Sequence, residues 1–173
     1  MYLISIYFDE ATSGRIQQYI NQVAKASGNT YMIDEKVPVH ITLSAIDTRN
    51  IEKVEQVLEQ VIQTLQRGTL QWVSIGAFLP HVLFLQPLQN HYLFELMNQI
   101  YDAVSAVEDV AVRKCYQPFC WIPHTTIAKK LLREEMQAGF EALQSSFGIF
   151  EGTVTRIGLA KTNPYKDIRS WEL

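Results

Sequence analysis

Two short stretches of the chain carry the same pattern of side chains that could do chemistry. Residues 40–43 (HITL) and residues 124–127 (HTTI) each read His, any residue, Thr, apolar. Histidine transfers protons near neutral pH, and two histidines can flank a phosphate ester from opposite sides. One would activate the attacking oxygen and the other would protonate the leaving oxygen. The pair therefore predicts acid–base chemistry at a phosphodiester, in a scheme that requires no metal or other cofactor.

Each motif falls in a segment of strand composition, where side chains alternate between the two faces. His40 and Thr42 would then share one face, about 6.8 Å apart along the strand, and His124 and Thr126 would do the same. A single motif of this kind is more often structural than functional. Its repetition in both halves of the chain, each time just after a proline, favours function. We predict His40 and His124 as catalytic residues and Thr42 and Thr126 as phosphate ligands, all facing one groove.

The elements that must position these motifs form two similar series. In the first half, the pattern predicts a strand, a helix, a loop, a strand, a helix and two strands at 2–8, 13–26, 27–36, 37–46, 50–66, 70–78 and 82–86. In the second half, it predicts a helix, a variable stretch, a strand, a helix and two strands at 90–104, 105–118, 119–129, 133–147, 149–161 and 168–173.

This order predicts an α+β fold in a single domain, residues 1–173. Two pseudo-symmetric lobes, approximately 1–86 and 87–173, would each hold an antiparallel sheet covered by helices, with strand exchange between them allowed. The central groove would lie between the lobes.

Composition and charge exclude several classes of function. The formal net charge is −3, whereas a protein that grips duplex DNA usually carries a basic surplus. No apolar run approaches the roughly 18 residues of a membrane span, and the N-terminus has the composition of a strand, not of a signal peptide. Cys115 and Cys120 have poor zinc-site spacing, which favours reduced thiols in a cytoplasmic protein. We expect a monomer that binds a nucleotide or an RNA-end phosphate ester, without membrane or duplex DNA.

The chain resembles the two-histidine phosphoesterase superfamily, in its 2′-5′ RNA ligase-like branch. The resemblance rests on residues 40–43 and 124–127, with support from the leading strand, the GAFLPHVLFLQ segment and the closing strands. It implies a bilobal fold and hydrolase or ligase activity in RNA processing: opening of 2′,3′-cyclic phosphates, reversible 2′-5′ ligation, or trimming of RNA ends. The chain departs from the family in having Ile127 where Leu is usual, and Lys36 in a loop where several members have arginine.

Five further residues are candidates for lining the substrate site, each with a structural alternative. Tyr7 and Tyr165 could stack on a base or simply pack, and Lys36, Lys129 and Lys130 could attract phosphate or remain solvated.

These observations leave three classes of function. The leading one is a cyclic phosphodiesterase or ligase. The second is a nucleotide-binding or RNA-end-binding module with little turnover, and the third is a structural domain, which the paired motifs disfavour.

Overall fold

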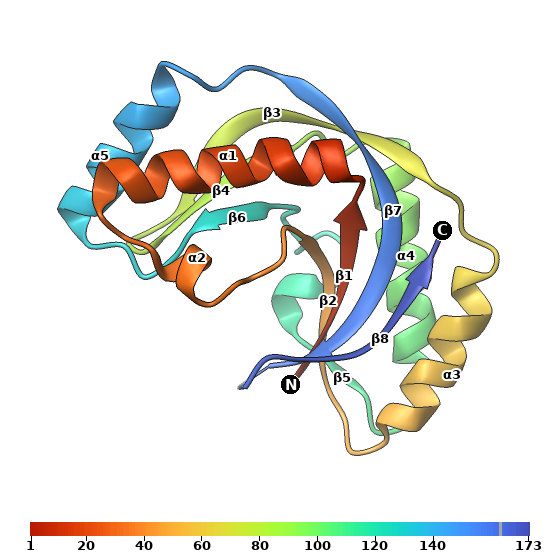
Figure 1. The fold of residues 1–173 in the computed structure, drawn as a ribbon. Helices are drawn as coiled ribbons and strands as arrows, with labels where there is room; N and C mark the ends of the chain where they lie inside the picture. The colour runs from red at the N-terminus through yellow and green to blue at the C-terminus, as the bar shows by residue number, and fades with distance from the viewer. Residues whose placement is uncertain (163) are drawn as a thin grey trace.

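Strands from all parts of the chain pair into one antiparallel sheet, in the order β5-β2-β1-β7-β3-β4-β6, with β8 also paired to β7 (Figure 1). The computed structural model describes residues 1–162 and 164–173. Within them the elements are β1 (Tyr2–Phe8), α1 (Glu10–Ser27), α2 (Tyr31–Asp34), β2 (Ile41–Asp47), α3 (Ile51–Ile62), β3 (Gly68–Phe78), β4 (Val82–Pro87), α4 (His91–Ser105), β5 (Ala111–Val112), a 3₁₀ turn (Lys114–Tyr116), β6 (Thr125–Ala128), α5 (Arg133–Gln144), β7 (Phe150–Lys161) and β8 (Lys166–Glu172). The predicted α+β class is confirmed.

Polar caps in the sequence mark the starts of α1, α3 and α4. Asn50 and Asn90 accept backbone hydrogen bonds from Lys53 at 3.3 Å and Leu93 at 2.9 Å, which satisfies amides that the first helical turn leaves unpaired. Asp9 caps α1 in the same way, so this helix begins at Glu10, earlier than the predicted residue 13. These caps fix the ends of the helices that cover the sheet.

Two sequence-based expectations about local structure are wrong. The predicted loop 27–36 contains the short helix α2. The motif strands are shorter than predicted, because β2 begins at Ile41 and β6 at Thr125, each one residue after a histidine. Pro38 and Pro123 lie just before these starts, and a proline cannot donate to a strand ladder.

The helices pack in two groups, α1 with α5 and α3 with α4. Figure 1 shows β3 and β7 as long curved ribbons that connect these groups. The N-terminal part of β7 pairs with β3, whereas β1 and β8 pair farther along it. First-half elements α1, β3 and β4 thus lie beside second-half elements β6 and α5. The division into lobes near residue 86 stays a prediction.

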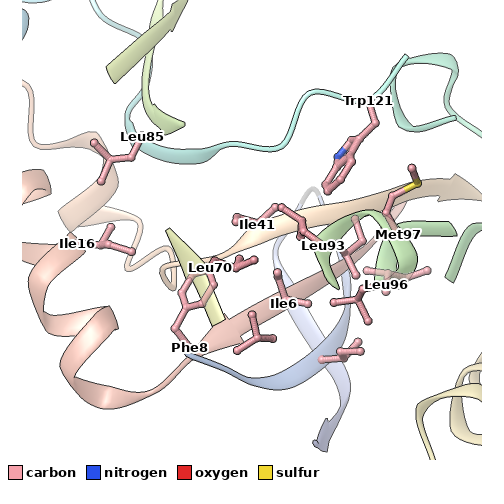
Figure 2. Packing of buried hydrophobic residues seen from close by; sticks show 14 of the residues in the cluster. Ile6, Phe8, Ile16, Ile41, Leu70, Leu85, Leu93, Leu96, Met97 and Trp121 are labelled. Atoms are coloured by element: carbon pink, nitrogen blue, oxygen red, sulfur yellow. The ribbon is translucent and has the colours of Figure 1, made fainter. Parts of the chain in front are cut away.

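The core centres on aromatic stacking and on aliphatic side chains from several elements. Trp72 is fully buried, stacks on Phe150 with ring centroids 4.9 Å apart and meets the Phe8 ring edge-on at 5.0 Å. Figure 2 shows Ile6 of β1 and Leu93 of α4 in the same cluster. This burial supplies the main driving force for folding.

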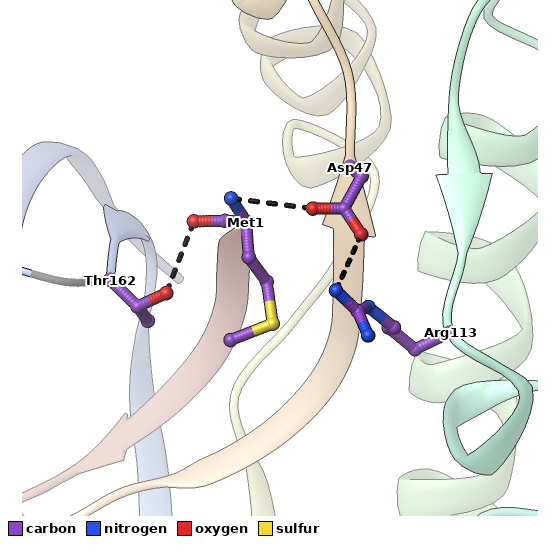
Figure 3. Close-up of polar contacts among 4 residues, drawn as sticks. All are labelled: Met1, Asp47, Arg113 and Thr162. Atoms are coloured by element: carbon purple, nitrogen blue, oxygen red, sulfur yellow. Dashed lines mark hydrogen bonds and ion pairs between the residues drawn. The ribbon is translucent and has the colours of Figure 1, made fainter.

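Ion pairs tie the chain start to the sheet edge that holds β2. The Met1 ammonium lies 3.3 Å from Asp47, which also pairs with Arg113 at 2.9 Å, and the Thr162 hydroxyl donates to the Met1 carbonyl at 3.2 Å (Figure 3). Exposed pairs of this kind contribute little to the stability of the fold. Within the described residues, no helix has the length and apolarity to cross a membrane.

Candidate active site

The rings of the two histidines are anchored in the same way. The Nδ1 atom of His40 lies 2.6 Å from the carbonyl oxygen of Pro38, and that of His124 lies 2.8 Å from the carbonyl oxygen of Ile122. A backbone carbonyl can only accept, so each Nδ1 carries the hydrogen and donates it. Each Nε2 is therefore the nitrogen left to gain or lose a proton.

Curvature of the sheet brings the two motifs together. In the strand order, β2 and β6 are separated by β1, β7, β3 and β4, and in a flat sheet they would lie about 24 Å apart at roughly 4.8 Å per strand. Instead, the indole nitrogen of Trp121, just before β6, donates to the carbonyl of Thr42 in β2 at 3.0 Å. The charge of His124 also influences the pKa of His40, which requires the two rings to be near each other.

Burial lowers the pKa of both histidines, because a charged imidazolium is poorly solvated in the protein interior. The backbone hydrogen bond opposes this effect in each case. The pKa of His40 is lowered further by the positive charges of His124 and Lys129. Simultaneous protonation of the two rings is thus disfavoured, and His40 is the ring with two nearby cations opposing its protonation.

The two threonines of the motifs have different surroundings. Thr42 is buried and accepts a hydrogen bond from its cross-strand partner Ser5 at 3.5 Å. Thr126 is half-buried and lies opposite Phe84 on β4. The hydroxyl of Thr126, in the second motif, is therefore more exposed than that of Thr42.

Thr125, between the two motif residues, has a structural role. It is fully buried and accepts a hydrogen bond from the Trp72 indole at 3.1 Å. The core therefore holds β6 directly at the motif.

Two phenylalanines that the sequence analysis missed surround His124. The ring centroids of Phe78 on β3 and Phe84 on β4 lie 4.8 and 5.5 Å from that of His124. The Phe84 ring covers its cross-strand partner Gly76, where an added Cβ would come within 2.4 Å of the ring. Side chains alternate along β3 and β4, and this alternation assigns each phenylalanine to one face of the sheet. Only the pairing of the strands shows that these rings contact His124.

A related arrangement lies beside His40. The Tyr7 ring centroid is 6.2 Å from that of His40. Tyr7 lies over Gly158 of β7, where an added Cβ would be 2.7 Å from the ring. Each histidine therefore has a neighbouring aromatic ring that occupies space left open by a glycine.

The remaining predicted site residues fall into two groups, those close to His40 and those away from it. Lys129 is near enough to His40 to lower its pKa, whereas the Lys130 ammonium lies 4.3 Å over the Tyr31 ring. Tyr165 lines a second cavity together with Tyr7, and its hydroxyl donates to Asp167 at 2.6 Å.

A cavity of about 530 Å³ opens beside His40. Lys36, Tyr7 and Pro38 line it, together with Arg156. The fold thus gathers Tyr7, Lys36, Lys129 and Tyr165 on the His40 side, whereas the Lys130 ammonium lies against Tyr31 of α2. No cluster of three or more His, Cys, Asp or Glu residues suited to a metal occurs in the part of the chain that the structure describes.

An antiparallel α+β fold that brings two His-x-Thr motifs together is the arrangement of the two-histidine phosphoesterases. The family model for the 2′-5′ RNA ligase superfamily matches residues 9–165. The chain therefore belongs to the 2′-5′ RNA ligase superfamily, whose activities are of phosphoesterase or ligase type.

Solved structures agree on the fold. TT0787 of Thermus thermophilus is similar with a TM-score of 0.65 and 15% identity, over 99% of this chain and 97% of that one. LigT of E. coli, solved with ATP, is similar with a TM-score of 0.56 and 18% identity, over 99% of this chain and 96% of that one. LigT solved with 3′-AMP gives a TM-score of 0.55 at the same identity and coverage. No curated protein sequence matches the chain significantly.

Proposed function

We propose that the protein is a metal-independent phosphoesterase that opens 2′,3′-cyclic phosphates of nucleotides or RNA ends. The observation that carries this proposal is the common anchoring of His40 and His124. Both rings donate from Nδ1 to a carbonyl two residues earlier, which leaves two equivalent Nε2 atoms for proton transfer. General acid–base catalysis needs one neutral and one protonated group at such positions.

The charges around the site suggest which histidine has which role. His40, whose pKa is lowered by burial and by two nearby cations, is suited to be the neutral base that accepts a proton from water. The water oxygen then bonds to phosphorus while the bond from phosphorus to one ribose oxygen breaks. His124 donates its proton to that departing oxygen. Thr42, Thr126 and Lys129 would donate hydrogen bonds to the non-bridging phosphate oxygens.

The same acid–base pair acting in reverse would join RNA ends through a 2′-5′ linkage.

Binding without turnover is the second candidate function. It is favoured by the fact that the structurally similar LigT has been solved with ATP, with 3′-AMP and, at lower similarity, with phosphate. The monomeric state and the cytoplasmic location of this chain stay predictions.

A panel of 2′,3′-cyclic nucleotides and 2′-5′-linked oligonucleotides, assayed before and after exhaustive chelation, tests the proposal. We expect turnover of at least one cyclic phosphate at a rate that EDTA does not change, because the site's charge stabilisation comes from hydrogen-bond donors and a lysine. Activity that EDTA abolished and zinc or manganese restored would contradict the two-histidine scheme. Nucleotide binding with no turnover across the panel would favour the binding module.

The pH dependence of kcat/KM is expected to be bell-shaped, with its maximum below pH 6.5, the ordinary pKa of histidine. The productive free enzyme holds one proton shared between the two rings, and burial lowers the pKa of both from 6.5. As the pH rises above these lowered values, the acid loses its proton. As it falls below them, the base gains one, and the rate declines on both sides. Initial rates in buffers of constant ionic strength measure the profile, and a maximum well above pH 7 would contradict this assignment.

A further inference from the structure

We propose that the cavity beside His40 binds a second phosphate group of the substrate through Arg156. On this basis the preferred substrate is a 5′-phosphorylated nucleotide or an oligonucleotide, not a nucleoside that carries only the reacting phosphate. The inference rests on the proposed function, because that function identifies the reacting group as a phosphate ester. Binding of a second phosphate in the cavity can be tested by affinity measurements alone.

The position of the cavity fits a group that is covalently linked to the reacting phosphate. Its volume is about 530 Å³, and both Tyr7 and Pro38 line it. The Tyr7 ring lies beside the His40 ring, and the Pro38 carbonyl accepts the His40 hydrogen bond. The cavity therefore begins at the residues that border the acid–base site. In a nucleotide chain, the other negatively charged group that lies nearest to the reacting phosphate is the next phosphate along the chain.

Arg156 is fixed in place at this cavity before any ligand binds. It is the direct cross-strand partner of Tyr7, and its guanidinium carbon lies 4.5 Å from the centroid of the Tyr7 ring. Gly158 leaves space for that ring. Tyr165 lines a second cavity together with Tyr7 and Arg156, and its hydroxyl donates to Asp167 at 2.6 Å. A guanidinium that lies over an aromatic ring retains N–H donors for contact with phosphate.

The local charge favours an anion, although the chain as a whole is acidic. Lys36 and Arg156 line the cavity together with one carboxylate, that of Glu10, and Asp167 lies at the neighbouring cavity that Arg156 also lines. Across residues 1–162 and 164–173, no ion pair involves the Arg156 guanidinium. Glu172 is its cross-strand partner on β8, but that residue is exposed and forms no ion pair with it. A half-buried arginine with unused donors beside an acid–base site is suited to phosphate.

Calorimetric titration with adenosine 3′-phosphate and adenosine 3′,5′-bisphosphate measures the contribution of the second phosphate. We expect the wild-type protein to bind the bisphosphate about tenfold more tightly, as one charge-assisted contact would provide. Arg156→Gln is expected to bring the ratio of the two affinities to about one. Arg156→Lys, which keeps the charge, should retain part of the preference and so exclude misfolding as the cause of the loss.

Arg15→Gln is the matched control. The Arg15 guanidinium also stacks on an aromatic ring, 4.4 Å from the Phe150 centroid, but Arg15 lines other cavities. Its affinity ratio should equal that of the wild type. A wild-type ratio near one, or a preference that survives Arg156→Gln, would overturn the proposal. Tight binding of the bisphosphate without turnover of cyclic phosphates would refute the proposed hydrolase activity and support the second phosphate site. Turnover of cyclic phosphates with an affinity ratio near one would support the hydrolase activity and refute the second phosphate site.

Discussion

Replacing His40 or His124 with alanine is expected to lower turnover of a 2′,3′-cyclic nucleotide by roughly 10²–10⁴, the usual contribution of a positioned general acid or base. In the proposed mechanism, each substitution removes the Nε2 atom that would act on its side of the phosphate. Initial-rate kinetics of the purified variants measure the effect. The double variant should lose less than the product of the single losses, because an acid and a base that act in one step are not independent.

Two sets of variants make this result interpretable. Thr42→Ala and Thr126→Ala should have smaller effects than the histidine changes, because each removes one hydrogen bond from several on the phosphate. His91→Ala should retain full activity, since His91 is exposed at the start of α4 and pairs only with Glu95, at 3.8 Å. If both motif variants kept wild-type turnover, the catalytic assignment of the histidines would be wrong.

Trp72→Ala is expected to reduce the free energy of unfolding by about 3–5 kcal/mol, the usual cost of removing a large buried ring. Trp72 is fully buried between Phe8 and Phe150, so its loss leaves a cavity that fixed strands on either side cannot fill. Its indole also holds Thr125 beside the second motif. Urea unfolding followed by circular dichroism measures the change. A loss below about 1 kcal/mol would show that the core relaxes around the cavity.

A pair of Trp→Phe variants separates the hydrogen bond from the ring. Trp72→Phe leaves the buried Thr125 hydroxyl without its donor, which costs about 1–3 kcal/mol. Trp171→Phe is the matched control, because the buried indole nitrogen of Trp171 has no hydrogen-bond partner among the described residues. Its loss should be clearly smaller than that of Trp72→Phe. Equal losses would mean that the bond to Thr125 contributes no measurable stability.

Local signals predicted most of the secondary structure. Asn50 and Asn90 marked helix starts that the structure confirms, because a capping side chain acts within three residues of itself. The strand at residues 2–8 was likewise predicted with its observed bounds. Short-range hydrogen bonding and alternation are properties of neighbouring residues, so they can be read directly from the order of amino acids.

The order of amino acids did not indicate how the site is built around its motifs. Alternation along β1 could not show that Arg156, almost 150 residues later, lies opposite Tyr7. Phe78 and Phe84 were missed for the same reason. Strand pairing over such distances depends on which apolar faces are buried together, and no local signal encodes that choice.

The sequence by itself predicted the candidate chemistry, because two histidines and two threonines recur in the same short pattern. How the two motifs come together was decided only by the tertiary structure. In the strand order β2 and β6 are separated by four strands, and only the curvature of the whole sheet turns β6 toward β2. Curvature arises from the summed twist of many strand pairs and from the packing of helices against them, so it belongs to the assembled sheet and not to any segment of it.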